Sequence, residues 1–186
     1  MRRVALISAK WLRAARVIRQ GGIVAYPTEY CFGLGCDPRN RDAVQRLLRL
    51  KGRPPSKGLI LIAANPSQLA PYVDEIPQPV LATWPGAHTW LLKPRTDVSA
   101  RITGRHARIA VRVTAHPLAA GLCRAAKMAM VSTSANRAGQ QPARSYREVM
   151  RRFGKSIDYV VPGRVGSALA PTPIRDSESG VLVRPG

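Results

Sequence analysis

Short apolar segments that alternate with amphipathic ones constrain the fold of this chain more than any other feature. The segments typical of strands are IVAY at 23–26, GLILIAA at 58–64, HTWLLK at 88–93, RIAVRV at 108–113 and MAMVST at 128–133. Apolar residues at helical spacing lie at about 11–18, 41–50, 116–126 and 145–152. Short strands that alternate with helices predict an α/β fold around one twisted sheet.

Turn and capping residues mark the ends of several of these segments. We expect Ser8 to cap the first helix and the glycine pair at 21–22 to end it. The spacing of Ser145 and Glu148 predicts a capping box at the start of the last helix. The segment PTEYCFGLGCDPRN at 27–40 is typical of a turn.

Length and composition favour one domain. The chain has 186 residues, of which 45% are apolar, enough for one hydrophobic core, and no repeat or linker divides residues 1–186. The apolar runs are shorter than the roughly 20 residues that a membrane span needs, and the N-terminal segment carries Arg and Lys within its apolar part. We therefore expect a cytoplasmic protein with no membrane segment, in which Cys31, Cys36 and Cys123 are buried free thiols.

Positive charge is the strongest signal in the composition, with 30 Lys and Arg against 10 Asp and Glu. The resulting formal charge of +20 predicts attraction to polyanions such as nucleic acid. The alternative is that the cations coat a solvated surface, because they are spread along the chain instead of forming one tail. Composition alone leaves both interpretations open.

The stretch LKGRPPSKGLILIAAN at 50–65 gathers three cations, Lys51, Arg53 and Lys57, directly before a strand. The intervening Gly52 and the prolines after Arg53 are expected to keep the backbone extended, so that Lys51 and Arg53 point to the same side. Such a pair suits a triphosphate, because Arg grips phosphate oxygens with a planar fork and Lys adds a compact charge. The alternative is a set of ordinary exposed cations.

A second polar cluster, VSTSANRAG at 131–139, follows an apolar strand and contains Ser132, Thr133, Ser134 and Asn136. Ligands of open α/β sheets bind at strand ends, and hydroxyl and amide groups donate hydrogen bonds to phosphate or carboxylate. An ordinary turn would have the same composition.

Two arginines interrupt strand-like segments, Arg112 in RIAVRV and Arg184 in GVLVRPG. A cation within a strand needs an anionic partner when it is buried. Asp176 or Glu29 could be that partner, and a bound ligand is the alternative.

Several common motifs are missing from the sequence. GLGC at 33–36 lacks the third glycine of a dinucleotide fingerprint, and no segment fits the GxxxxGK[ST] phosphate loop. No His, Cys or acidic residues have metal-ligand spacing, and there is no GxSxG elbow. Nothing in the sequence indicates hydrolytic covalent catalysis.

Taken in order, several segments resemble the motifs of the YrdC/TsaC family, the threonylcarbamoyl-AMP synthases, in their short bacterial form. These segments are AYPTEYCFGLGCDP, LKGRPPSKGLILIAAN, WPGAHTW, AVRVTAHPL, VSTSANRAG, PIRD and VRPG. The resemblance covers about Gly21 to Gly186 and implies a single-domain YrdC/RibB-like fold, with a twisted, mostly parallel sheet and flanking helices around a basic concave cavity. It also implies a nucleotidyltransferase that converts L-threonine, bicarbonate or carbon dioxide, and ATP with magnesium into threonylcarbamoyl-AMP and pyrophosphate.

The resemblance also implies roles for individual residues. Lys51 and Arg53 match a KxR motif and would be the catalytic pair that holds the phosphates. The remaining ATP-binding positions would be Lys57, Ser134 and Asn136, the last two in an SxN motif, together with Arg184. The threonine-binding positions would be Arg112, Ser132 and Thr172, with Tyr30 as a further candidate. Longer relatives often carry Thr at position 30 and a hydroxyl or imidazole at position 62, where this chain has Tyr30 and Ile62.

The resemblance further implies that the product serves tRNA modification through separate transferase proteins, with tRNA itself as a possible direct partner. A non-catalytic RNA-binding protein that acts in ribosome maturation is the alternative that the charge also permits. Such a protein needs cations on an outer face, with exposed aromatic residues for stacking. This chain has only 5% aromatic residues and places its distinctive cations at strand ends.

Overall fold

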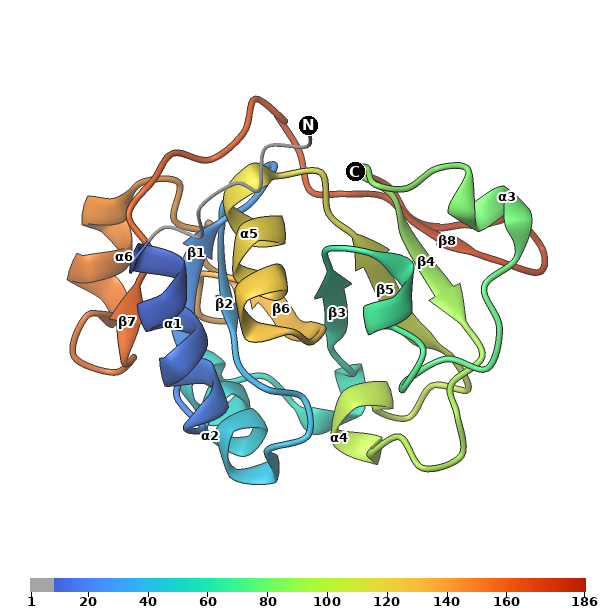
Figure 1. Ribbon diagram of the computed structural model, residues 1–186, viewed down its shortest axis with the longest axis horizontal. Coiled ribbons are helices and arrows are strands. Elements are labelled where there is room, and N and C mark those ends of the chain that lie inside the picture. The colour runs from blue at the N-terminus through green and yellow to red at the C-terminus, as the bar shows by residue number, and fades with distance from the viewer. Residues whose placement is uncertain (1–8) are drawn as a thin grey trace, which may run out of the picture.

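The structure is a computed structural model in which residues 9–186 are described, and it contains one nine-stranded sheet (Figure 1). The strand order across the sheet is β7-β1-β2-β6-β3-β5-β4-β8-β9. The strands are β1 (Val24–Pro27), β2 (Phe32–Gly35), β3 (Ile60–Ala63), β4 (Thr89–Leu92), β5 (Ile109–Val113), β6 (Met130–Ser134), β7 (Tyr159–Val160), β8 (Ile174–Asp176) and β9 (Leu182–Arg184).

Helices flank this sheet. They are α1 (Ala9–Arg19), α2 (Arg41–Lys51), α3 (Gln78–Leu81), α4 (Ala100–Thr103), α5 (Pro117–Ala126) and α6 (Tyr146–Phe153), with short 3-10 helices at Pro55–Lys57 and Pro66–Gln68. The α/β fold that the alternating pattern predicts is therefore confirmed. Within residues 9–186, no helix combines the length and the apolar character that crossing a membrane requires.

The sheet is mixed, so the expectation of mostly parallel strands is wrong. Parallel pairing joins β1 to β7, β3 to β5 and β4 to β8, while the other five neighbouring pairs are antiparallel. Much of the difference comes from β2, which lies in the segment expected to be a turn and pairs antiparallel with both β1 and β6.

Glycines explain why β2 resembles a turn in the sequence. A Cβ atom at Gly35 would lie 2.4 Å from the carbonyl oxygen of Val131 and 2.9 Å from the ring of Tyr26. The strand therefore needs glycine where a neighbouring backbone and a buried ring approach closely. The residues that usually mark a strand are missing for this reason.

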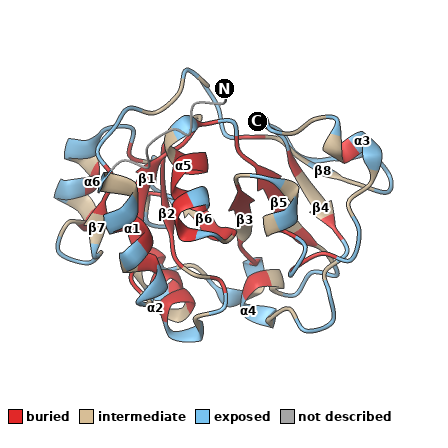
Figure 2. Ribbon diagram, in the orientation of Figure 1, coloured by how far each residue is buried: buried red, intermediate tan, exposed pale blue. Residues whose placement is uncertain are grey.

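Two apolar clusters form the core on opposite faces of the sheet. Figure 2 shows in red that the buried residues lie on the strands and on parts of the flanking helices. Alternation along β3 shows the division, because Leu61 and Ala63 belong to one cluster and Ile62 to the other. Helices α1 and α5 pack on the Ile62 side, while α2 and α6 contribute to the other cluster. The three cysteines are free and buried, as expected.

Helix ends agree in part with the sequence. The capping box of Ser145 and Glu148 begins α6, and Gly21 follows α1 with a φ of 81°. Ser8 lies outside the described residues. Helix α2 extends through Lys51 and ends at Gly52 in the left-handed conformation, with a φ of 61°. The expectation of an extended backbone from Lys51 to Arg53 is therefore wrong, because Gly52 turns the chain there.

Candidate active site

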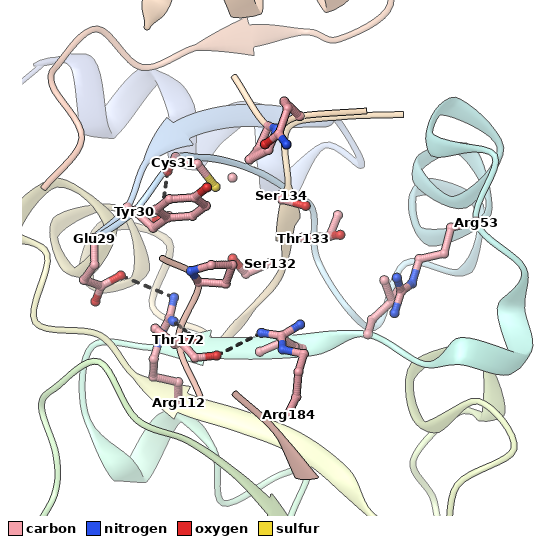
Figure 3. A pocket seen from close by; sticks show the side chains of 17 residues that line it. Glu29, Tyr30, Cys31, Arg53, Arg112, Ser132, Thr133, Ser134, Thr172 and Arg184 are labelled. Atoms are coloured by element: carbon pink, nitrogen blue, oxygen red, sulfur yellow. Dashed lines mark hydrogen bonds and ion pairs between the residues drawn. The ribbon is translucent and has the colours of Figure 1, made fainter. Parts of the chain in front are cut away.

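A cavity of about 300 Å³ is lined by residues of β2, β3, β5, β6 and β9 and of the loops that connect the strands (Figure 3). Its wall includes the turn between β1 and β2, the exit of β6, Arg112 of β5 and the two segments that contain Thr172 and Arg184. Among its lining residues are seven of the site residues proposed from the sequence: Tyr30, Arg53, Arg112, Ser132, Ser134, Thr172 and Arg184. Residues from distant parts of the sequence therefore share one site.

A second cavity, of about 220 Å³, contains the other three proposed residues, Lys51, Lys57 and Asn136. Arg53 and Ser134 line both this cavity and the first one. The KxR and SxN segments therefore line the same cavity, and one residue of each also lines the first cavity. Contact of these residues with ATP remains a prediction.

Lys51 connects these two segments directly. Its Nζ atom donates a hydrogen bond to the carbonyl oxygen of Asn136 at 2.7 Å and another to that of Ser134. The side chain is buried, with only 5% of Lys51 exposed. Burial, with a smaller effect from the charge of Arg53, lowers the pKa of Lys51 to about 8. Lys51 therefore fixes the loop after β6 and also carries charge into the site.

Arg53 lies where three cavities meet. It lines the two cavities described above and a third one, of about 200 Å³, whose wall is largely apolar. Its Nε donates to the carbonyl oxygen of Gly58 at 3.0 Å, and its Nη2 donates to that of Lys57 at 3.1 Å. These bonds hold the guanidinium of Arg53 against the backbone of the basic turn, at its place between the cavities.

A row of cations extends through the site from Lys51 to Arg53, Arg184 and Arg112. Burial lowers the pKa of Arg53, and the charge of Arg184 adds a smaller effect in the same direction. Burial likewise lowers the pKa of Arg184, with a smaller effect from the charge of Arg112. Among residues 9–186, no carboxylate lies within 4.0 Å of Lys51, Arg53 or Arg184. Such a row favours binding of an anion.

Arg112 has an anionic partner, and that partner is Glu29. The Nη2 atom of Arg112 lies 3.3 Å from Oε2 of Glu29, and its Nη1 donates to Oγ1 of Thr172 at 2.7 Å. Asp176, the other candidate, pairs with Arg108 at 3.0 Å. Arg184 donates instead to the carbonyl oxygen of Thr172 at 2.9 Å. Thr172 therefore holds both arginines of the interrupted strands.

Two positions differ from the pattern of longer relatives. The ring of Tyr30 lies at the cavity wall, and the guanidinium carbon of Arg144 is 5.0 Å from its centroid. Ile62 is fully buried in the core cluster with α1 and α5 and does not line the cavity. Ile62 is therefore a core residue here.

Sequence reasoning missed some residues of the wall. Glu29 was considered only as a partner for an arginine, and Cys31 and Gln141 were not considered as lining residues. Their positions depend on the β1–β2 hairpin and on the loop before α6. The only local signal for Glu29 is its place as the last residue of the PTE segment at 27–29.

No group of three or more His, Cys, Asp or Glu side chains in residues 9–186 could hold a metal ion. The one carboxylate of the main cavity, Glu29, already pairs with Arg112. The described residues therefore do not fit a magnesium ion held by the protein alone.

Comparison with known proteins identifies the family. Residues 16–186 match the model of the Sua5, YciO and YrdC proteins, described as Telomere recombination. The chain belongs to this family. A threonylcarbamoyl-AMP synthase of Halorhodospira halophila is 55% identical over 175 residues, with 92% of each chain covered. Another, of Methylobacillus flagellatus, is 54% identical over 172 residues and covers 90% of this chain and 95% of its own.

Solved structures agree with this assignment. P. abyssi Sua5 complexed with L-threonine superposes with a TM-score of 0.88 at 32% identity, over 95% of this chain and 54% of the Sua5 chain. This chain therefore corresponds to about half of Sua5. E. coli YciO gives a TM-score of 0.81 at 28% identity, over 95% of this chain and 88% of the YciO chain.

Proposed function

We propose that this protein is an L-threonylcarbamoyladenylate synthase and, by reaction class, a nucleotidyltransferase. It joins L-threonine, bicarbonate or carbon dioxide, and ATP to give threonylcarbamoyl-AMP and pyrophosphate. The observation that carries this proposal is the cation row from Lys51 to Arg112, which leads from the KxR and SxN segments to Ser132 and Thr172. The names of the two relatives from Halorhodospira halophila and Methylobacillus flagellatus support the same reaction.

The two ends of the site suit different substrates. Arg112, Ser132 and Thr172 are buried and lie at one end, where a guanidinium and two hydroxyl groups can hold a small amino acid. Lys51, Arg53 and the SxN segment lie toward the other end and would hold phosphates. The third cavity has a largely apolar wall and shares Arg53 and Arg184 with the first, so it could receive the adenine base.

The chemistry requires positioning and positive charge. The threonine ammonium group first releases a proton to solvent, and the neutral amine attacks carbon dioxide. The N–C bond forms as one C=O π bond opens, and the nitrogen releases a second proton to solvent, which leaves an anionic carbamate. A carbamate oxygen then attacks the α-phosphorus of ATP, the bond from this phosphorus to the bridging oxygen breaks, and pyrophosphate leaves with the electron pair. The carbamate nucleophile and the pyrophosphate leaving group are both anions. Closely spaced cations therefore stabilise the approach of the carbamate to ATP and the departure of pyrophosphate.

Magnesium is proposed to enter with ATP, coordinated by its phosphates, as is usual for this ion. The product would serve tRNA modification through separate transferase proteins, and direct binding of tRNA remains a proposal. The non-catalytic alternative is less favoured, because Lys51, Arg53 and Arg184 line cavities instead of one outer face.

The proposal is tested by incubating purified protein with ATP, magnesium, bicarbonate and one amino acid at a time, followed by mass detection of the adenylate. We expect a product of the mass of threonylcarbamoyl-AMP with L-threonine. Formation of no carbamoyl adenylate with any amino acid would contradict the proposed reaction.

A further inference from the structure

Glu29 is the only acidic residue among those that line the main cavity, whose wall also contains Arg53, Arg112 and Arg184. A carboxylate weakens the binding of anions nearby. Arg112 is one cationic partner of Glu29, and a carboxylate at the cavity wall can also accept hydrogen bonds from a positively charged group on a ligand.

The carboxylate is fixed in position. Thr114 Oγ1 donates a hydrogen bond to Oε1 of Glu29 at 2.6 Å, and the backbone N–H of Ala168 donates to the carbonyl oxygen of Glu29 at 3.1 Å. A Cβ atom at Gly166 would lie 2.7 Å from that same carbonyl oxygen, so a second chain segment packs closely against Glu29. The side chain, 13% exposed, is thus held in place before any ligand arrives.

The two carboxylate oxygens of Glu29 differ in their partners. Oε2 is buried and forms no hydrogen bond among the described residues, although Arg112 Nη2 lies 3.3 Å away. Arg112 makes its shorter contact with Thr172, at 2.7 Å. Thr172 therefore orients Arg112, while Oε1 of Glu29 accepts one hydrogen bond from Thr114 and, as a carboxylate oxygen, can accept another from a ligand in the cavity that Glu29 lines.

Glu29 is charged near neutral pH. Burial alone would raise its pKa, but the charge of Arg112 and the hydrogen bond from Thr114 outweigh burial and hold the pKa below its ordinary value. Glu29 is accordingly an acceptor of hydrogen bonds and a poor carrier of protons.

An amino acid in water carries a carboxylate and an ammonium group on the same carbon. Arg112 and Glu29 present the complementary pair of charges side by side at one end of the cavity. We propose that Glu29 recognises the α-ammonium group of the amino acid substrate, while Arg112 and Thr172 receive its carboxylate. This inference rests on the proposed function and makes Glu29 a specificity-determining residue, which selects amines over otherwise identical acids.

The test compares two ligands of the same shape, L-threonine and the 2,3-dihydroxybutanoate in which a hydroxyl replaces the amino group. Binding is measured by titration calorimetry with the wild-type protein, Glu29→Gln and Glu75→Gln. Glu75 is exposed and does not line the cavity, so its variant is the matched control. We expect the wild type and Glu75→Gln to bind threonine about 10- to 100-fold more tightly than the hydroxy acid.

Glu29→Gln should lose most of this preference through weaker binding of threonine, with little change for the hydroxy acid. If Glu29 served only to support Arg112, both ligands would lose affinity in parallel and the ratio would persist, which would overturn the inference. Thr114→Val, which removes the bond to Oε1, should lower the ratio to a smaller extent.

The wild-type measurement keeps the test decisive even if Glu29→Gln does not fold. A wild type that binds threonine and the hydroxy acid equally well would overturn the role of Glu29 but leave the proposed reaction intact. A wild type that neither binds threonine nor converts it would overturn both.

Discussion

Lys51 Nζ, at the end of α2, lies 2.7 Å from the carbonyl oxygen of Asn136, in the loop that follows β6. This contact joins the two segments that the proposed reaction assigns to ATP. It also places a cation whose pKa is lowered to about 8 by burial and by Arg53 beside the cavity that they share.

The lowered pKa of Lys51 predicts how activity depends on pH. Above about pH 8 the unliganded enzyme loses this positive charge, so kcat/KM for ATP should fall by up to about tenfold per pH unit. The value of kcat should stay constant to a higher pH than kcat/KM, because bound phosphate favours the charged form of Lys51. Lys51→Met should have low activity, and its kcat/KM should not show this fall above about pH 8. A kcat/KM that stays level through about pH 10 would contradict the assignment.

Arg53 is predicted to contribute strongly to turnover. Arg53→Ala should lower kcat by about 100-fold or more, because a charged donor directed at developing phosphate charge contributes about 3 kcal/mol. Arg53→Lys should recover only part of the activity, since Lys lacks the planar fork. Steady-state kinetics measure these effects, with exposed Arg49→Ala as a control of equal charge. Near-normal turnover in folded Arg53→Ala protein would remove Arg53 from the catalytic site.

Direct binding of tRNA is predicted to use cations outside the cavity. Four arginines lie on or just before α6, at 144, 147, 151 and 152, but Arg144 stacks on Tyr30, and Arg152 donates to the carbonyl oxygen of Gln141. Arg147 and Arg151 are the two exposed candidates without such a contact among residues 9–186. Arg147→Glu with Arg151→Glu should weaken tRNA binding and reduce its dependence on salt, but spare adenylate synthesis.

The same two measurements separate this surface from the active site. The double variant should lose tRNA binding, measured across a salt series, but keep synthesis of threonylcarbamoyl-AMP. Arg53→Ala should lose synthesis but keep tRNA binding. Equal loss of synthesis in both would indicate one shared site. Undetectable or salt-insensitive tRNA binding by the wild type would mean that the exposed charge does not serve tRNA.

Periodicity predicted the longer elements well because their apolar residues face a buried surface. The strands β1, β3, β4, β5 and β6 and the helices α1, α2, α5 and α6 were all expected. The missed strand β2 depends on glycines that fit beside Tyr26 and Val131, and β7, β8 and β9 have only two or three residues each. Pairing with neighbours defines such strands, and a local pattern does not contain that information.

The site shows the same division between local and tertiary information. Ordered motifs placed Arg53, Ser134 and Arg112 at one cavity, because strand ends bring them together. They did not indicate that Gly52 turns the chain and directs Lys51 to the carbonyl groups after β6. Such contacts depend on how helices and loops pack.

The central claim is that one site joins threonine, carbon dioxide or bicarbonate, and ATP, and release of pyrophosphate tests it most directly. Purified protein is assayed with all three substrates and magnesium, and then with each component omitted in turn. The account predicts that pyrophosphate forms only when L-threonine, bicarbonate, ATP and magnesium are all present. Pyrophosphate release at the same rate without threonine would contradict it.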